Sequence, residues 1–381
     1  MIVEADVAVV GAGPAGSTAA ALLARQGLRV VLVERAEFPR DTVCGGFVSA
    51  EGVAVLRRLG ALGRIPGAPR VERVRIHSAS GRIAESALPT SSGEFPIAVR
   101  RSAFDAALRD LALEAGARSL APARVVALLW REDSVGGVEA LDRSGKRIAV
   151  TAPLTIGADG KHSTVAAASG ALARPAKWVG FAGFSEVPPR SRRDGLDLYL
   201  YMGGYGGILE LEKGVANVCG LVAARLLPEG ESRRDPAALL ASTFLANEAA
   251  GKRLASLRPL DTVVTTGALP LRARRPAGPG FALVGDAAGM IDPFTGDGIA
   301  IALRGAEILA EAVAISIAEG DFPRGVERRY ARAARREFAR RRSASAWLRL
   351  AAMRPVFGEA AMALAGRRPS ILDAWVRLTR G

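Results

Sequence analysis

The stretch Asp6–Glu34 constrains the fold of this chain more than any other part of the sequence. It consists of an apolar run (VAVV), the loop GAGPAG at Gly11–Gly16, an Ala/Leu-rich segment, a second apolar run (VVLV) and an acid. This order is typical of a strand, a phosphate-binding loop, a helix and a second strand. Gly11 permits the sharp turn out of the first strand, Gly13 lets a pyrophosphate approach the backbone without meeting a Cβ atom, and Gly16 lets the helix pack closely on the strand.

The loop and the acid that ends the second strand suit one kind of ligand. Pro14 fits the first helical turn, where its missing N–H leaves no donor unpaired, and the free N–H groups and positive end of the helix would face phosphates. Glu34, about twenty residues beyond the glycines, is placed to accept hydrogen bonds from an adenosine ribose, and its charge disfavours a 2′-phosphate there. We therefore predict an adenine dinucleotide site that also includes Ala15 and Arg35, with NAD and FAD as open alternatives.

Length and composition indicate a globular protein with a full core. The chain has 381 residues, of which 49% are hydrophobic, enough for two domains or one large domain with an insertion. No uncharged apolar run reaches the roughly eighteen residues of a membrane span, and no signal peptide precedes the first strand, so we expect a cytoplasmic location. The only cysteines and histidines are Cys44, Cys219, His77 and His162, whose spacing suggests neither a metal site nor a disulfide framework.

Positive charge is concentrated near the C-terminal end. Residues 323–381 contain fifteen arginines and four acidic residues, a net charge of +11 out of +14 for the whole chain. The main body is therefore close to neutral, and we expect no nucleic acid binding there.

The hydrophobic pattern predicts a dinucleotide domain that is interrupted by a second unit. Strands and helices alternate up to about residue 175, apart from a hairpin formed by Val71–His77 and Arg82–Leu88. Four strands and then helical stretches are expected between residues 178 and 264, after which a buried strand at Phe281–Val284 leads to a long helix that opens at Gly296–Gly298. We therefore expect an α/β fold: a Rossmann-like dinucleotide-binding domain (residues 1–70, 97–175 and 265–322), an inserted antiparallel β-sheet substrate domain (71–96 and 176–264) and a C-terminal helical region (323–381).

Three separated motifs resemble one family. They are GAGPAG with Glu34, GADG at Gly157–Gly160, and GDAAG with PFTGDG at Gly285–Gly298. Together they resemble the FAD enzymes built like p-hydroxybenzoate hydroxylase. Within that group, the stretches FPRDTVCGG and GDAAGMIDPFTGDGI are most similar to the geranylgeranyl reductase family, and the resemblance covers about residues 1–310. It implies that the dinucleotide is FAD.

The resemblance also implies roles for individual residues. Asp286, beside Gly285, would accept hydrogen bonds from ribityl hydroxyls, and the helix that opens at Gly296–Gly298 would point N–H groups at the flavin's pyrimidine carbonyl. Arg101 resembles the arginine that faces the FAD phosphate or ribose, although the adjacent Arg100 is an alternative. The remaining predicted FAD-binding residues are Cys44, Gly45, Val125, Asp159, Gly160, Pro293, Gly296, Asp297 and Gly298; a plain turn aspartate is the alternative for Asp159.

The reaction is less constrained than the cofactor. The family places Cys44 at the flavin and substrate cavity, and we predict Cys44 and Tyr205 as catalytic residues. The halogenase branch is disfavoured because its paired tryptophans are absent. The isoprenoid reductases carry an aromatic-rich strand that ends in Phe-Pro, whereas the nearest stretch here, YMGGYGGILELEKG, has Leu209-Glu210 at that place.

We therefore expect a reductase or dehydrogenase for a hydrophobic isoprenoid- or polyketide-like molecule, with hydride entering at flavin N5 and NAD(P)H as the implied electron donor. The alternatives are an NAD(P)H-dependent aromatic monooxygenase and a membrane-associated carrier of electrons to a quinone. The basic segment 324–342, followed by an apolar segment with a bend at Pro355, would suit contact with an anionic membrane surface. Its alternative is a solvated basic helix followed by an apolar helix packed on the FAD domain.

Overall fold

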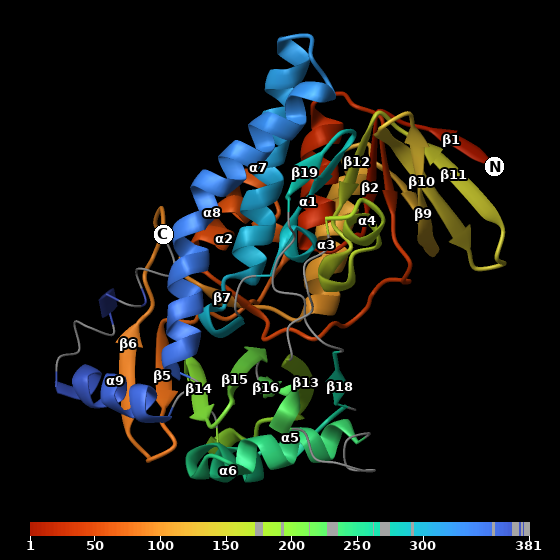
Figure 1. Ribbon diagram of the computed structural model, residues 1–381. Helices are drawn as coiled ribbons and strands as arrows, with labels where there is room; N and C mark the ends of the chain where they lie inside the picture. Colours follow the sequence, from red (N-terminus) through yellow and green to blue (C-terminus); the bar gives the residue numbers. More distant parts are fainter. Residues whose placement is uncertain are drawn as a thin grey trace.

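The computed structural model describes residues 1–171, 178–191, 194–212, 214–226, 235–261, 263–266, 275–290, 293–352, 355–367, 373–374 and 376. Figure 1 shows a helix-rich upper part, a small sheet beside it, and a lower part in which a second large sheet lies on helices. Ile291 and Asp292 of the predicted GDAAGMIDPFTGDGI stretch lie outside the described residues.

A six-stranded sheet forms the centre of the upper part. Its strand order is β19-β20-β12-β2-β3-β8, and all neighbours are parallel except β19 and β20. The central strands β2 and β3 are buried on both faces, which explains why VAVV and VVLV are continuous apolar runs rather than alternating ones. The bounds are β2 Val7–Val10, β3 Val30–Val33, β8 Arg118–Leu120, β12 Leu154–Gly157, β19 Ala277–Gly278 and β20 Phe281–Leu283.

Helices cover one face of this sheet and a second sheet covers the other. On the helical face, α1 contacts both α3 and α7, and α2 and α8 contact α7. The opposite face packs against α4 and a four-stranded sheet of order β1-β11-β10-β9. The bounds are α1 Pro14–Arg25, α2 Ala50–Leu59, α3 Arg101–Glu114, α4 Thr164–Ala168, α7 Gly298–Ala318, α8 Arg324–Ala352, β1 Ile2–Glu4, β9 Ala123–Arg131, β10 Ser134–Asp142 and β11 Arg147–Thr151.

The lower part is a separate sheet of order β17-β13-β16-β15-β14-β5-β6, with β18 paired to β13. Helices α5 and α6 cover one face, and the other face is turned toward the upper part (Figure 1). The bounds are β5 Arg73–His77, β6 Ile83–Ala87, β13 Trp178–Glu186, β14 Leu196–Tyr201, β15 Gly204–Glu212, β16 Val215–Ala223, β17 Arg258–Pro259, β18 Val264–Thr265, α5 Pro236–Leu245 and α6 Glu248–Ala255. A short ladder of β4 Phe47–Val48 and β7 Ile97–Ala98 completes the described sheets.

The predicted fold class, with a Rossmann-like part and an inserted sheet, is confirmed. The predicted hairpin is β5 and β6, but the expectation of a purely antiparallel inserted sheet was wrong in one place, because β5 and β14 run parallel. About 120 residues separate their paired positions Ile76 and Leu198. No tight turn therefore forces an antiparallel pairing between these two strands.

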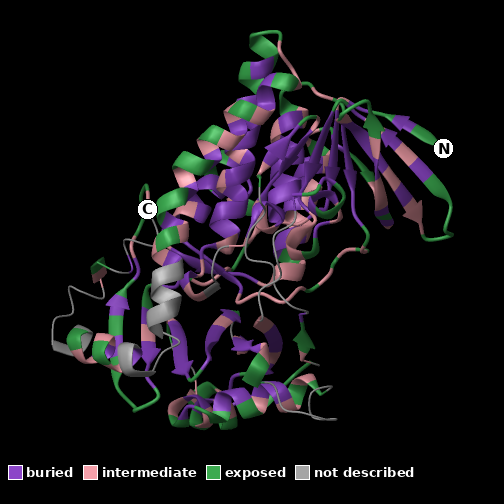
Figure 2. Cartoon of the chain, in the orientation of Figure 1, coloured by how far each residue is buried: buried purple, intermediate pink, exposed green. Residues whose placement is uncertain are grey.

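The C-terminal helices belong to the folded body. One side of α8, formed by Val326, Tyr330, Ala334 and Phe338, packs into the same core as α1 and α7. The helix is therefore not basic around its circumference, because the spacing of these residues gives it an apolar stripe; Figure 2 shows the resulting mixture of buried and exposed positions. The expected break falls between α8 and α9 Pro355–Arg367. The expectation that the apolar helix packs on the FAD domain was wrong, since α9 contacts β6 of the lower sheet.

Candidate active site

A large cavity lies where the parallel strands of the upper sheet end. Residues within three positions of the ends of β2, β3, β12 and β20 line it, among them Gly11, Glu34, Asp159 and Asp286, and the lower sheet forms its opposite wall. The cavity volume is about 730 Å³. In an open α/β sheet, ligands bind at the carboxyl ends of parallel strands, so the cavity lies where the topology predicts a dinucleotide.

The three glycines of the GAGPAG loop differ in whether the fold itself requires a glycine. Gly11 has φ +97°, and a Cβ atom on Gly16 would lie 1.8 Å from the carbonyl oxygen of Gly11. A Cβ atom on Gly13 would meet only Nη2 of Arg40, at 3.9 Å. Gly13 also occupies the N-cap of α1 without a side-chain cap, so the first N–H groups of this helix are open to the cavity. The fold thus needs glycine at 11 and 16, whereas at 13 it leaves open space.

Glu34 is held by the loop that it faces. One carboxylate oxygen accepts a hydrogen bond from the Ala12 N–H at 2.8 Å, and the other accepts one from the Ala36 N–H at 2.9 Å. Arg40 bridges Glu34, at 3.4 Å, to Asp105, at 3.1 Å. These bonds fix the carboxylate beside the phosphate loop.

Arg101, rather than Arg100, faces the cavity. The Arg101 guanidinium donates two hydrogen bonds to the fully buried carboxylate of Asp105, at 2.7 and 2.8 Å, and lies near the Cys44 thiol. Burial opposes its charge, but Asp105 and Cys44 raise the pKa of Arg101 above its usual range. Arg100 instead pairs with Asp41 and Asp261 and stacks on Phe184.

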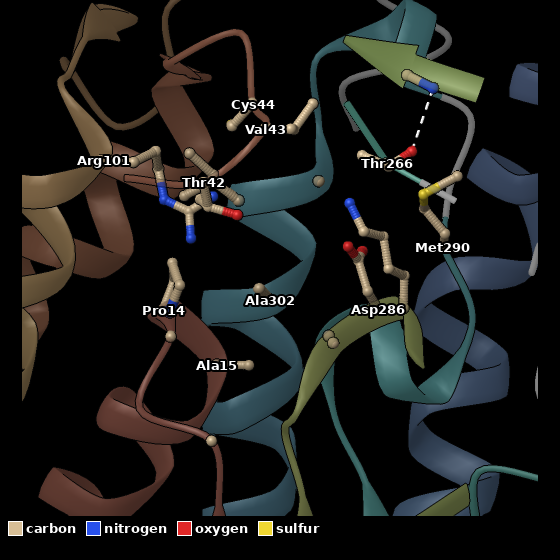
Figure 3. Close-up of a pocket in the computed structure, with 18 of the residues that line it drawn as sticks. Pro14, Ala15, Thr42, Val43, Cys44, Arg101, Thr266, Asp286, Met290 and Ala302 are labelled. Carbon is tan, nitrogen blue, oxygen red and sulfur yellow. Dashed lines mark hydrogen bonds between the residues drawn. The ribbon is translucent and has the colours of Figure 1, made fainter. Parts of the chain in front are cut away.

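Asp286, shown in Figure 3, interacts with Lys161, and Asp159 lines the same cavity. Burial raises the pKa of Asp286, and the nearby Lys161 and Arg101 oppose that rise. Burial lowers the pKa of Lys161, against the attraction of Asp286. Asp159 accepts hydrogen bonds from the Ser163 hydroxyl and the Thr164 N–H, both at 2.6 Å, so its carboxylate also fixes the start of α4; burial raises its pKa.

The N-terminus of α7 forms one end of the cavity. Gly296 and Gly298 line the cavity, and no side chain caps the helix. Asp297, between these two glycines, does not line the cavity; its carboxylate is fully buried and interacts with Arg341 of α8. Pro293 begins the short 3₁₀ helix that precedes these residues.

The wall supplied by the lower sheet is apolar. Leu196, Leu198, Leu209 and Leu221 line it from three neighbouring strands, around the small residue Gly207. Tyr205 lies at one end of this wall and packs edge-on against Phe294, with 5.1 Å between the ring centroids. A hollow edged by leucines and an aromatic pair suits an apolar ligand.

Two other residues near this wall have structural roles. The Tyr201 hydroxyl donates hydrogen bonds to the carbonyl oxygens of Tyr205, at 2.6 Å, and Leu221, at 3.2 Å, so Tyr201 fixes the strands and does not line the cavity. Cys219 lines the wall, and burial, followed by the proximity of Cys44, raises the pKa of its thiol to about 12.

The structure brings most of the predicted site residues to this one cavity. Those that line it are Gly11, Gly13, Pro14, Ala15, Glu34, Arg35, Cys44, Gly45, Arg101, Val125, Asp159, Gly160, Tyr205, Gly285, Asp286, Gly296 and Gly298. Gly16 serves the packing of α1 instead, and neither Pro293 nor Asp297 lines the cavity.

Sequence reasoning missed several residues of the cavity. Lys161 follows the Asp159-Gly160 motif directly, and that position was its only signal. Thr266, whose hydroxyl accepts a hydrogen bond from the Gly180 N–H at 3.1 Å, has no sequence signal (Figure 3). The buried carboxylate of Asp105 acts from behind the cavity on the two arginines that it binds.

These residues fit FAD. Two helix N-termini, those of α1 and α7, open to the same cavity without side-chain caps, which suits a ligand with phosphates in one part and a ring that gains negative charge in another. Among the described residues, no cluster of three or more His, Cys, Asp or Glu is arranged to hold a metal ion. The fold and the site define an FAD-dependent oxidoreductase.

Comparison with known proteins agrees with this class. The family model described as an FAD binding domain matches residues 4–210. A digeranylgeranylglycerophospholipid reductase of Methanothrix thermoacetophila is 33% identical over 84% of this chain and 80% of its own. A menaquinone reductase of Mycolicibacterium smegmatis is 31% identical over 82% of this chain and 76% of its own. The chain belongs to the geranylgeranyl reductase family of FAD-binding proteins.

Solved structures show the same fold. A geranylgeranyl bacteriochlorophyll reductase-like protein from Thermoplasma acidophilum superposes with a TM-score of 0.82 at 22% identity, covering 99% of this chain and 100% of that one. A flavin-dependent brominase superposes with a TM-score of 0.81 at 20% identity, covering 99% of this chain and 93% of that one. At such identities the likeness establishes the fold and leaves the reaction open.

Proposed function

We propose that this flavoprotein reduces or dehydrogenates carbon–carbon bonds of a hydrophobic isoprenoid- or polyketide-like substrate. The observation that carries the proposal is the apolar wall formed by Leu196, Leu198, Leu209 and Leu221 across the cavity from the residues proposed to bind FAD. Relatives named for isoprenoid lipids and menaquinone support a substrate of this kind. The predicted division into an FAD-binding domain, a substrate domain and a C-terminal region is part of the same proposal.

Bound FAD would supply hydride transfer, and the chain would supply binding, orientation and a proton. We propose that the open N-terminus of α1 holds the pyrophosphate, that Glu34 binds the adenosine ribose, and that Asp286 binds the ribityl hydroxyls. The pairing of Arg101 with the buried Asp105 keeps its guanidinium charged and fixed beside the cavity. The leucines of the lower sheet would exclude water from the reacting bond.

The proton would come from the predicted catalytic residues. The Cys44 thiol accepts a hydrogen bond from the Gly46 N–H at 3.4 Å and lies against Arg101. The Tyr205 side chain lies 5% exposed at the edge of the apolar wall. If these groups act in proton transfer, Cys44→Ser and Tyr205→Phe should lower turnover while FAD content stays unchanged; unchanged turnover in both variants would remove them from the mechanism.

NAD(P)H remains the proposed electron donor. Arg35, Lys161 and His162 line the cavity and would attract a second dinucleotide's phosphates. Anaerobic mixing of the holoenzyme with NADH or NADPH should bleach the flavin absorbance near 450 nm, roughly the usual position for oxidised flavin. If neither compound bleaches it, a protein donor takes its place.

Peripheral membrane contact through α8 is also proposed. Its packed side contains Tyr330, Phe338 and the buried Arg341, but Arg324, Arg328, Arg332, Arg335, Arg336 and Arg340 are exposed. Each arginine near an anionic leaflet contributes about 1 kcal/mol. Truncation before α8 would remove part of the core, so the better test neutralises Arg332, Arg335, Arg336 and Arg340 with glutamine. Loss of co-sedimentation with anionic vesicles at low salt would support contact, and wild-type protein that never sediments would exclude it.

Substrate class is tested by filling the hollow. A Cβ atom on Gly207 would lie 3.3 Å from Leu198 Cδ2 and 3.7 Å from Cys219 Sγ, so Gly207→Val fits the fold with a small adjustment and occupies ligand space. We expect this variant to keep FAD but to lose the absorbance change that a geranylgeranyl lipid or menaquinone produces in the wild-type flavin. Gly63→Val, at a position whose Cβ atom would meet nothing within 4 Å, is the control. Equal ligand binding in both variants would argue against the apolar wall as the substrate site.

A further inference from the structure

The C-terminal helix α8 carries a buried arginine next to the proposed flavin site. Arg341 is 8% exposed, and its guanidinium donates hydrogen bonds to both carboxylate oxygens of Glu51, one of them at 3.0 Å. Glu337, one turn earlier on α8, lies 4.0 Å away. Glu51 is in the first turn of α2, the helix that packs against α7. This pair therefore joins the first turn of α2 to a position well inside α8, 290 residues along the chain.

Arg341 also lies near the N-terminus of α7, because the first turn of α2 packs on the first turn of α7: a Cβ atom on Gly52, next to Glu51, would lie 3.2 Å from the Cβ atom of Ala300. It interacts electrostatically with Asp297, the fully buried N-cap residue of that helix. Asp297 stands between Gly296 and Gly298, both of which line the cavity, while Asp297 itself does not. Arg341 thus interacts with three carboxylates behind the helix end that faces the cavity, those of Glu51, Asp297 and Glu337.

The balance of these charges matters for a bound flavin. Two-electron reduction places negative charge on the pyrimidine side of the ring, which the positive end of a helix stabilises. A carboxylate at that helix end opposes this effect, and a buried cation beside it offsets the opposition. We propose that Arg341 is a positioning residue of the flavin site, which neutralises Asp297 and Glu51 behind the N-terminus of α7 and so raises the reduction potential of bound FAD. The inference rests on the FAD site in the proposed function.

A merely structural ion pair makes a different prediction. Removal of either partner of a buried pair destabilises the fold because the other charge is left without compensation. If Arg341 and Glu51 only hold α8 on α2, then Arg341→Gln and Glu51→Gln should loosen the same contact. Both variants should then shift the midpoint potential of bound FAD in the same direction. An electrostatic role requires opposite directions, because one variant removes a positive charge and the other a negative charge.

The test is the midpoint potential of FAD in the holoenzyme, measured by anaerobic reductive titration against reference dyes, together with the melting temperature. Arg341→Gln should shift the equilibrium toward oxidised flavin by about three- to tenfold, and Glu51→Gln should shift it toward reduced flavin by a similar factor. For a two-electron couple these factors correspond to about 14 to 30 mV. Arg341→Lys, which keeps the charge, should stay near wild type and keeps the test available if Arg341→Gln fails to fold.

Arg340→Gln is the matched control, since it removes the same charge from the adjacent, exposed position of α8. It should leave the potential unchanged. Shifts of the same sign in Arg341→Gln and Glu51→Gln, or a fall in melting temperature with no shift of potential in either, would overturn the proposal and leave a structural ion pair. Wild-type protein that does not retain FAD would instead defeat the FAD site itself.

Discussion

The phosphate loop supports a prediction that separates ligand binding from folding. A Cβ atom on Gly13 would have only the end of a flexible arginine side chain within 4 Å, at 3.9 Å, and the residue has φ −77°, which any L-amino acid adopts. The protein itself therefore tolerates a side chain at this position. Gly13→Val should leave the unfolding free energy of the FAD-free protein within about 1 kcal/mol of wild type.

The same side chain would occupy the space proposed for the FAD pyrophosphate. If it displaces two charge-assisted hydrogen bonds, each contributing about 1.5 to 3 kcal/mol, FAD binding weakens by about two to four orders of magnitude. The assay is the melting temperature at increasing FAD concentration, because a ligand that binds only the folded state raises it. Wild type and Gly63→Val should respond to FAD, and Gly13→Val should not. An equal response in all three proteins would refute the placement of the pyrophosphate.

Three further predictions concern the surroundings of the site. Asp105→Asn removes the fully buried carboxylate that its two arginine partners share, so it should lower FAD retention and reduce the unfolding free energy by about 3 kcal/mol. Asp110→Asn, whose half-exposed side chain lies on the same helix, should change neither quantity; equal effects of the two variants would contradict this role. Tyr330→Phe removes the hydrogen bond from its hydroxyl to the Leu283 carbonyl oxygen, at 2.6 Å, and should cost about 1 to 2 kcal/mol in urea unfolding; no loss would mean that the bond does not stabilise the fold. Because the pKa of the Cys219 thiol is raised to about 12, the thiol is almost entirely protonated at pH 8, so its alkylation should be slow in folded protein and faster at higher pH. Fast labelling of Cys219 at pH 8 would contradict the raised pKa.

The sequence motifs predicted those site residues whose positions are fixed within one short segment of the chain. The left-handed turn at Gly11, the close approach at Gly16 and the acid that ends β3 all arise within one strand–loop–helix–strand unit, so their spacing carries the information. The same holds for Asp286, which follows a buried strand. Tyr205 was found on an aromatic- and glycine-rich strand whose alternation places it on the cavity side.

Contacts between distant segments could not be predicted in this way. In the sequence, Arg341 is one of many arginines on a helix that was predicted to be basic. In the structure it binds Glu51, because α8 and α2 both pack on α7. The parallel pairing of β5 with β14 joins two strands that are far apart in the sequence. No turn connects them directly, so no turn motif could have predicted this pairing.

The central claim is that a hydrophobic unsaturated substrate takes its hydride from reduced FAD in this cavity. The most direct measurement reduces the flavin of the holoenzyme anaerobically and follows its reoxidation on addition of a geranylgeranyl lipid, menaquinone or an aromatic acid, with mass analysis of the products. The account predicts reoxidation by the lipid or the quinone side chain without oxygen, with a product two mass units heavier, about the mass of the hydride and proton added. Reoxidation that requires oxygen and yields an oxygenated aromatic product would contradict it in favour of a monooxygenase. Reoxidation only through the quinone ring would indicate an electron carrier.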